Sequence, residues 1–99
     1  MPYIEQKDRP QLDRHIEKLA KEIIKLSRAS GNDVTYSNVN FTGYLNYACT
    51  RLALKVIPGR RYWAIALVTG VFKNIADEFY RRYAAPYEDE KIKENGDVY

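Results

Sequence analysis

Acidic side chains near the carboxyl end of the chain are the residues best suited to metal chemistry. Asp77 and Glu78 are adjacent, and Glu88, Asp89 and Glu90 follow with Lys91 beside them. Carboxylates with a lysine can bind Mg²⁺ and position a phosphate, as metal-dependent nucleases require. Their spacing fixes no ligand geometry, and adjacent acids in a charged segment are usually just solvated. We therefore expect no metal site and no cofactor.

The single histidine, His15, is the other candidate for proton transfer. It precedes Ile16 at the margin of an apolar helical stripe, where a histidine is more often packed or capping than catalytic. It has no second histidine with which to build a zinc site. The chain also lacks a phosphate-cradling glycine loop, a Gly-x-Ser-x-Gly elbow, a His-Glu-x-x-His and a Cys-x-x-Cys. We expect no catalytic residue.

A regular basic row is the strongest candidate for binding nucleic acid. Its members are Arg14, Lys18, Lys21, Lys25 and Arg28. They follow the apolar residues of the same helix by two positions, which is about 200° of rotation, so they point away from the core and could lie along a phosphate backbone. Acidic residues are interspersed, and Glu17 can pair with Lys21 four positions later. An ordinary solvated helix face is the favoured interpretation.

Tyrosine is unusually abundant, with nine in 99 residues. Tyrosine combines a large ring with a polar tip, which suits half-exposed surfaces and interfaces. The candidates for an interface are Tyr44, Tyr47, Tyr80, Arg81, Arg82 and Tyr87. Stacking on bases is conceivable where tyrosine and arginine are adjacent, but no RNP-type motif or alternating strand platform presents it.

Hydrophobic periodicity predicts the first two helices. Apolar residues at spacings of four and three predict a helix from about Pro10 to Ser30, ended by Gly31. Residues 31–43 break this period and predict a loop or a short hairpin. Thr42 is expected to cap a second helix that Pro58 and Gly59 end. Its apolar face is expected to be Leu45, Cys49, Leu52 and Val56.

The third predicted helix runs from about Arg61 to Ala85 and is the central element, because its first half is apolar nearly all round. Gly70 in its interior indicates either close approach by another helix or a tolerated glycine. The acidic segment after Pro86 contains Asn95-Gly96, which favours a tight turn. The fold class is therefore mainly α, a compact three-helix domain with a possible small β hairpin or paired extended ends.

Length and charge narrow the class of protein. Ninety-nine residues predict one domain, for which dimerisation would add burial. Cys49 is the only cysteine, so no internal disulfide is possible and a reducing compartment is expected. The start of the chain lacks the apolar region of a signal peptide, and the apolar stretch 62–72 is far short of the roughly 20 residues of a membrane span. Residues 1–83 carry +6 and residues 84–99 carry −3, which fits an anionic partner or a tail that folds back.

Several short elements, in order, resemble a known family. They are Met1-Pro2-Tyr3-Ile4, Gly43-x-Leu45-Asn46-Tyr47, Glu78-Phe79-Tyr80-Arg81-Arg82, Pro86-Tyr87-Glu88-Asp89-x-Lys91 and Asn95-Gly96-Asp97-Val98-Tyr99. Together they are similar to a family of short uncharacterised proteins of archaeal filamentous DNA viruses, phages and some prokaryotes. The resemblance implies a viral or phage origin and no mechanism. It also favours a docked segment 86–99, with Pro2-Tyr3-Ile4 and Asp97-Val98-Tyr99 as a small extended pair.

The expected function is that of a non-enzymatic viral accessory protein that binds protein, most simply as a homodimer. We expect it to be thermostable and to act in the cytoplasm of an infected cell, where a host or viral protein could be a further partner. The alternative is a nucleic-acid-binding protein that uses the basic row. A membrane partner is not expected.

Overall fold

The computed structural model describes residues 2–29 and 40–99 of the chain. These residues are mostly helical, which confirms the mainly α fold class. They contain no strand, so the predicted extended pair between the two ends of the chain is wrong. The hairpin predicted in residues 31–43 falls almost entirely outside the described residues. Of the described residues, 3–29 and 40–58 form one compact unit, and 59–99 together with Pro2 form another. The single-domain organisation stays a prediction.

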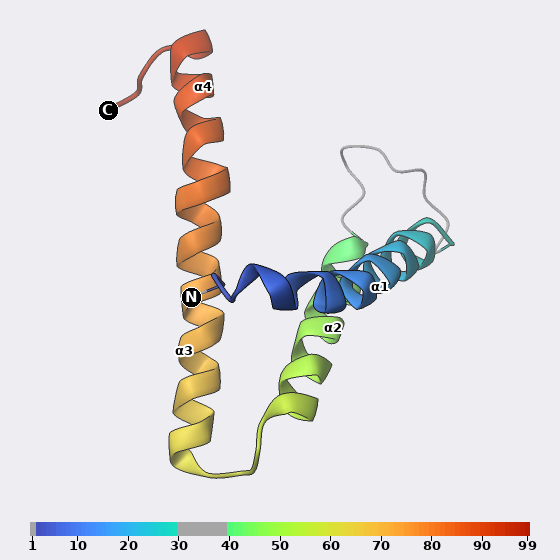
Figure 1. The fold of residues 1–99 in the computed structure, drawn as a ribbon. Coiled ribbons are helices and arrows are strands. Elements are labelled where there is room, and N and C mark those ends of the chain that lie inside the picture. Colours follow the sequence, from blue (N-terminus) through green and yellow to red (C-terminus); the bar gives the residue numbers. More distant parts are fainter. Residues whose placement is uncertain (1, 30–39) are drawn as a thin grey trace. The chain divides into compact units, whose positions relative to one another are not determined.

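The first unit begins with a short 3-10 helix, η1 (Gln6–Asp8), that leads directly into α1 (Arg9–Ala29) (Figure 1). The Arg9 guanidinium donates two hydrogen bonds to the backbone oxygen of Ile4, at 3.1 Å from Nε and 2.9 Å from Nη2. This contact ties the amino-terminal segment to the first turn of α1. The helix starts one residue before the predicted Pro10, which suits the first turn because proline has no N–H to satisfy.

Helix α2 (Phe41–Val56) packs against α1. The prediction that Thr42 caps it is wrong, because the helix already begins at Phe41 after Asn40, whose side chain makes no capping bond. The helix ends at Val56 as expected, since Ile57 is extended, as the residue before a proline usually is. The more buried side chains are Tyr44 and Ala48 on α2 and Ile23 and Ser27 on α1. The predicted apolar face of α2, Leu45, Cys49, Leu52 and Val56, is exposed.

The second unit is dominated by one continuous helical rod (Figure 1). It consists of α3 (Tyr62–Phe79), the π-helical turn η2 (Tyr80–Ala84) and α4 (Ala85–Asn95). We refer to residues 62–95 as the rod. The prediction that the helix ends at Ala85 before Pro86 is therefore wrong, and the segment after Pro86 is helical.

The π turn explains how the rod passes through Pro86. Proline lacks an N–H, and its ring clashes with the carbonyl four residues earlier in a regular α-helix. Here the Ala85 N–H bonds to the Tyr80 oxygen, five residues back, so the turn before the proline is wider than an α turn. The wide turn relieves the clash that normally ends a helix.

Gly96 ends the rod. Its φ of 89° lies in the region that only glycine adopts without strain, and its N–H bonds to the Ile92 oxygen at 2.8 Å. Glycine therefore performs a helix-ending role here in place of the predicted tight turn. Val98 and Tyr99 beyond it are fully exposed. Docking of the last residues against another surface stays a prediction.

Burial is scarce in both units. Among the described residues only Ser27, at 6% exposure, and Ala64, at 2%, are buried. Ser27 satisfies its hydroxyl by donating to the Ile23 backbone oxygen at 2.6 Å. Apart from the backbone of its own helix and its chain neighbours, no atom of the described residues lies within 4 Å of the position that a Cβ on Gly70 would occupy, which favours the tolerated-glycine interpretation within its unit. The described residues of neither unit include a fully buried large apolar side chain.

Candidate interaction surfaces

The rod carries a long apolar stripe, which we call the rod stripe. Its members are Ile65, Val68, Phe72, Ile75, Phe79, Tyr83 and Tyr87. They recur every three or four residues, which places them on one side of a helix. All but the half-buried Val68 are exposed, by 39–71%. Apolar surface that is contiguous and exposed to this extent marks an interaction site in a soluble protein.

The π turn keeps the rod stripe straight at its carboxyl end. Residues four apart in an α-helix drift about 40° around the axis, so a run of such spacings slowly leaves one face. Phe79, Tyr83 and Tyr87 are spaced by four on either side of the wide turn, which offsets this drift. The Phe79 and Tyr83 rings stack with centroids 5.0 Å apart, and the Lys91 ammonium lies 5.5 Å from the centre of the Tyr87 ring. The three aromatic residues therefore extend the stripe into α4.

Polar side chains along the rod are paired with one another. Arg81 donates from Nη2 to both carboxylate oxygens of Glu78, at 2.8 and 2.9 Å. Lys91 pairs with Glu94 at 3.0 Å. The Tyr80 hydroxyl donates to Glu88 Oε2 at 3.2 Å across the π turn. Two of these contacts pair opposite charges within the chain, and the third ties Tyr80 to Glu88 across the π turn.

The Tyr80 phenol responds to its acidic neighbours. Its pKa is raised above the usual 10.0, mainly because the nearby Glu88 carboxylate opposes a second negative charge and also accepts the hydroxyl hydrogen bond. Smaller contributions come from desolvation, Tyr99 and Asp89. Tyr80 therefore stays a hydrogen-bond donor throughout the physiological pH range.

All five residues of the basic row, Arg14, Lys18, Lys21, Lys25 and Arg28, lie on α1 and are exposed. The ion pairs in the described part of the chain are Lys7–Glu5, Arg81–Glu78 and Lys91–Glu94, and none of them is on α1. The expected pair between Glu17 and Lys21 is therefore not formed. Cations that no local carboxylate neutralises can bind an external anion at lower cost.

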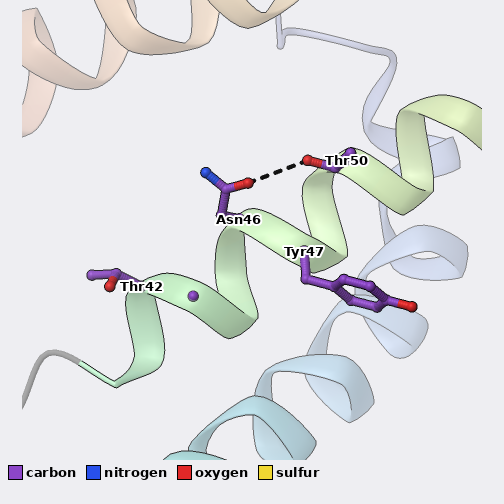
Figure 2. A pocket seen from close by; sticks show the side chains of 5 residues that line it. Thr42, Asn46, Tyr47 and Thr50 are labelled. Carbon is purple, nitrogen blue, oxygen red and sulfur yellow. Dashed lines mark hydrogen bonds between the residues drawn. The ribbon is translucent and has the colours of Figure 1, made fainter.

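A shallow depression of about 500 Å³ lies along α2. It is lined by Thr42, Gly43, Asn46, Tyr47 and Thr50. Figure 2 shows the Thr50 hydroxyl directed at the Asn46 amide oxygen, to which it donates at 3.3 Å, and the Tyr47 ring directed away from this pair. The lining has no carboxylate, histidine or lysine, so it offers hydrogen bonds and no group for general acid or base catalysis at neutral pH.

The two groups of acids that the sequence analysis weighed as metal ligands lie on the rod, Asp77 and Glu78 in α3 and Glu88 to Glu90 in α4. Residues 2–29 and 40–99 contain no group of three His, Cys, Asp or Glu side chains that could hold a metal ion. Glu78 and Glu88 are instead used by Arg81 and Tyr80. His15 lies exposed on α1.

The predicted interface residues divide between the two units. Tyr44 and Tyr47 lie on α2, whereas Tyr80, Arg81 and Arg82 form most of the π turn. Tyr87 lies on α4, in the rod stripe. Sequence reasoning missed the π turn itself and the Tyr80–Glu88 bond, because that bond spans eight residues across a non-α turn. The Glu78–Arg81 pair was recognisable from its i,i+3 spacing.

Comparisons with known proteins place the chain in a family without assigning it an activity. None of the helices in the described residues has the length and apolar character that a membrane crossing requires. No curated protein and no solved structure matches the chain. A family model described as a domain of unknown function (DUF6899) matches residues 1–98. Since this match spans nearly the whole chain, the protein belongs to the DUF6899 family.

Proposed function

We propose that the protein acts by binding protein, and that it forms a homodimer through the rod stripe. The observation that carries the proposal is the scarcity of burial: Ser27 and Ala64 are the only buried residues among those described. Fully burying one large apolar side chain contributes roughly 1.5 to 3 kcal/mol, and the stripe offers several that are exposed. Association is the direct way to gain that stabilisation.

The available area supports a dimer. A large aromatic side chain buries about 150–250 Å² when covered, so the exposed parts of the stripe offer on the order of 600 Å². A stable interface buries about 800 Å² on each partner. Polar residues that flank the stripe can supply the difference, as the rim of an interface usually does.

The test is sedimentation equilibrium of the full chain at micromolar concentration. Phe79→Asp places a charge in the middle of the stripe and should weaken the dimer at least 100-fold. The matched control is Asn74→Asp, which introduces the same charge on the opposite side of the helix and should leave the dimer intact. The melting temperature of the unaltered protein should also rise with protein concentration, because association stabilises only the folded chain. A strict monomer would overturn the proposal.

A nucleic-acid-binding role for α1 is the second candidate, supported by the absence of ion pairs on its basic row. Neutralising phosphates releases counterions, so binding should fall steeply as salt is added. The triple variant Lys18→Gln, Lys21→Gln, Lys25→Gln should lose affinity for DNA and show a shallower salt dependence. A control that removes the same charge elsewhere, Lys7→Gln, Lys55→Gln, Lys73→Gln, should bind nearly as well as the unaltered chain. Equal losses would assign any binding to net charge alone.

The resemblance and the cysteine usage support a proposal for the cellular setting. We propose a viral accessory protein that works in the cytoplasm of an infected cell, where Cys49, the only cysteine, stays reduced. Affinity capture from infected cells, with and without nuclease treatment, would show whether a further partner is a protein or is bridged by nucleic acid.

A further inference from the structure

We propose that the two rods of the dimer pair antiparallel, with the two-fold axis near residues 78 and 79. This inference rests on the proposed homodimer and adds its orientation. The reason lies in the charges at the two ends of the rod, which have opposite signs. The rod stripe supplies attraction in either orientation, so the charges decide between them.

The amino end of the rod is basic. Arg60 and Arg61 precede α3, both are exposed, and residues 62–72 carry no charge at all. The carboxyl end is acidic, since residues 84–99 have five acids against two lysines and a net charge of −3. The helix dipole adds to both, because its positive end lies at the amino terminus and its negative end at the carboxyl terminus.

A parallel pair would bring each charged end against its own copy, so like charges would meet at both ends. An antiparallel pair brings Arg60 and Arg61 of one chain beside Glu94 and Asp97 of the other, and it does so twice because of the two-fold symmetry. The antiparallel pair also brings the positive end of each helix dipole beside the negative end of the other. Charge complementarity of this kind selects orientation even where it adds little affinity.

Full overlap of the rods places the aromatic residues of the stripe at the symmetry axis. Residues 62 and 95 are equidistant from a midpoint at 78 and 79, so Phe79 of each chain meets its copy there, with Tyr83 about one turn further out on each side. Aromatic rings at the centre with charged residues at the rim is the arrangement typical of stable interfaces. The second copy is therefore the occupant that best fits the rod stripe.

Distances between nitroxide labels test the orientation separately from dimerisation. In a Cys49→Ser background, single labels are placed at Tyr62→Cys, Asp77→Cys and Asn95→Cys, none of which is in the stripe. In an antiparallel dimer the two copies of the label at position 62 should lie about 50 Å apart, from 1.5 Å of rise per residue, and so should the two copies at position 95. The two copies at position 77 should lie under about 30 Å apart. Short distances at all three positions would establish a parallel dimer and overturn this inference while leaving the proposed function intact. No dipolar coupling at any position would mean a monomer and overturn both.

Charge reversal provides an independent test by sedimentation. The pair Arg60→Glu, Arg61→Glu should weaken the dimer about 10-fold at low salt, and so should Glu94→Lys, Asp97→Lys. The chain with all four changes should recover most of the affinity, because each reversed end then meets a reversed partner. Added salt should shrink these differences. Additive weakening in the fourfold variant would contradict the antiparallel pairing.

Discussion

Helix α1 and the rod are both amphipathic, yet charged side chains pair with one another on the rod and do not on α1. On the rod, Glu78 pairs with Arg81, Lys91 with Glu94, and Glu88 accepts a bond from Tyr80. On α1, Glu17 and Lys21 stand at a spacing that permits a pair and form none. Internal pairing leaves the rod with an apolar stripe as its main binding feature. The lack of pairing leaves α1 with a basic row, which depends on electrostatics and therefore on salt.

The largest expected effect tests whether the rod must be continuous. Ala76→Pro introduces a proline without a π turn before it and should lower the free energy of unfolding by about 3 kcal/mol or more. It should also abolish the dimer. Ala76→Gly, the matched control, should cost only about 1 kcal/mol. Urea unfolding followed by circular dichroism at fixed protein concentration measures the stability of both variants. Equal stability of the two variants would contradict the requirement for a continuous rod.

The next effect measures the difference in charge pairing directly. A double-mutant cycle on Glu78→Gln and Arg81→Gln should give a coupling energy of about 0.5–1 kcal/mol, because the contact involves both carboxylate oxygens. The same cycle on Glu17→Gln and Lys21→Gln should give a coupling near zero. Similar coupling energies for the two pairs would contradict the difference in charge pairing between α1 and the rod.

A smaller effect concerns Tyr80. Because its folded pKa is raised above the unfolded 10.0, its contribution to stability is fully present below pH 10.0 and is lost as the pH rises through the folded value. Glu88→Gln should lower the Tyr80 pKa toward the usual value, because it removes the main cause of the shift. The difference in phenolate absorbance between each protein and its Tyr80→Phe counterpart isolates this one titration. An unshifted titration in Glu88→Gln would assign the shift to other neighbours.

The smallest effect is expected at the carboxyl terminus. Removing Val98 and Tyr99 should leave the melting temperature within about 1 °C, since both side chains are fully exposed. A drop of several degrees would instead support docking of these residues on a partner chain. Measuring the drop at high and low protein concentrations distinguishes docking on a partner chain from docking within the same chain, because only docking on a partner depends on association.

Local sequence rules predicted the helices of the described residues well and their tertiary surroundings poorly. Periodicity located the amino end of α1 to within one residue, and Ile57-Pro58 marked the end of α2. The predicted end of the first helix at Ser30 and Gly31 lies outside the described residues. The end of the rod was misplaced because Pro86 was taken to end the helix, and no residue pattern announces the π turn that accommodates it. The predicted apolar face of α2 was also wrong, since Leu45 and Leu52 were chosen by hydrophobicity and are exposed, whereas Tyr44 and Ala48 are partly buried. Which face of a helix is buried depends on the element that it packs against, and the sequence of the helix alone does not identify that element.

The π turn at Tyr80–Ala84 also determines how the rod tolerates changes in length. A turn closed by a bond from residue 85 to residue 80 holds one residue more than an α turn. Deleting a single residue there, for example Ala84, would close the turn as regular α-helix and would bring back the clash of Pro86 that the wide turn relieves. The same deletion anywhere else in the rod would rotate everything after it by about 100° and break the stripe. The extra residue of the π turn and Pro86 are therefore linked, and a deletion in this turn should be tolerated only together with replacement of the proline.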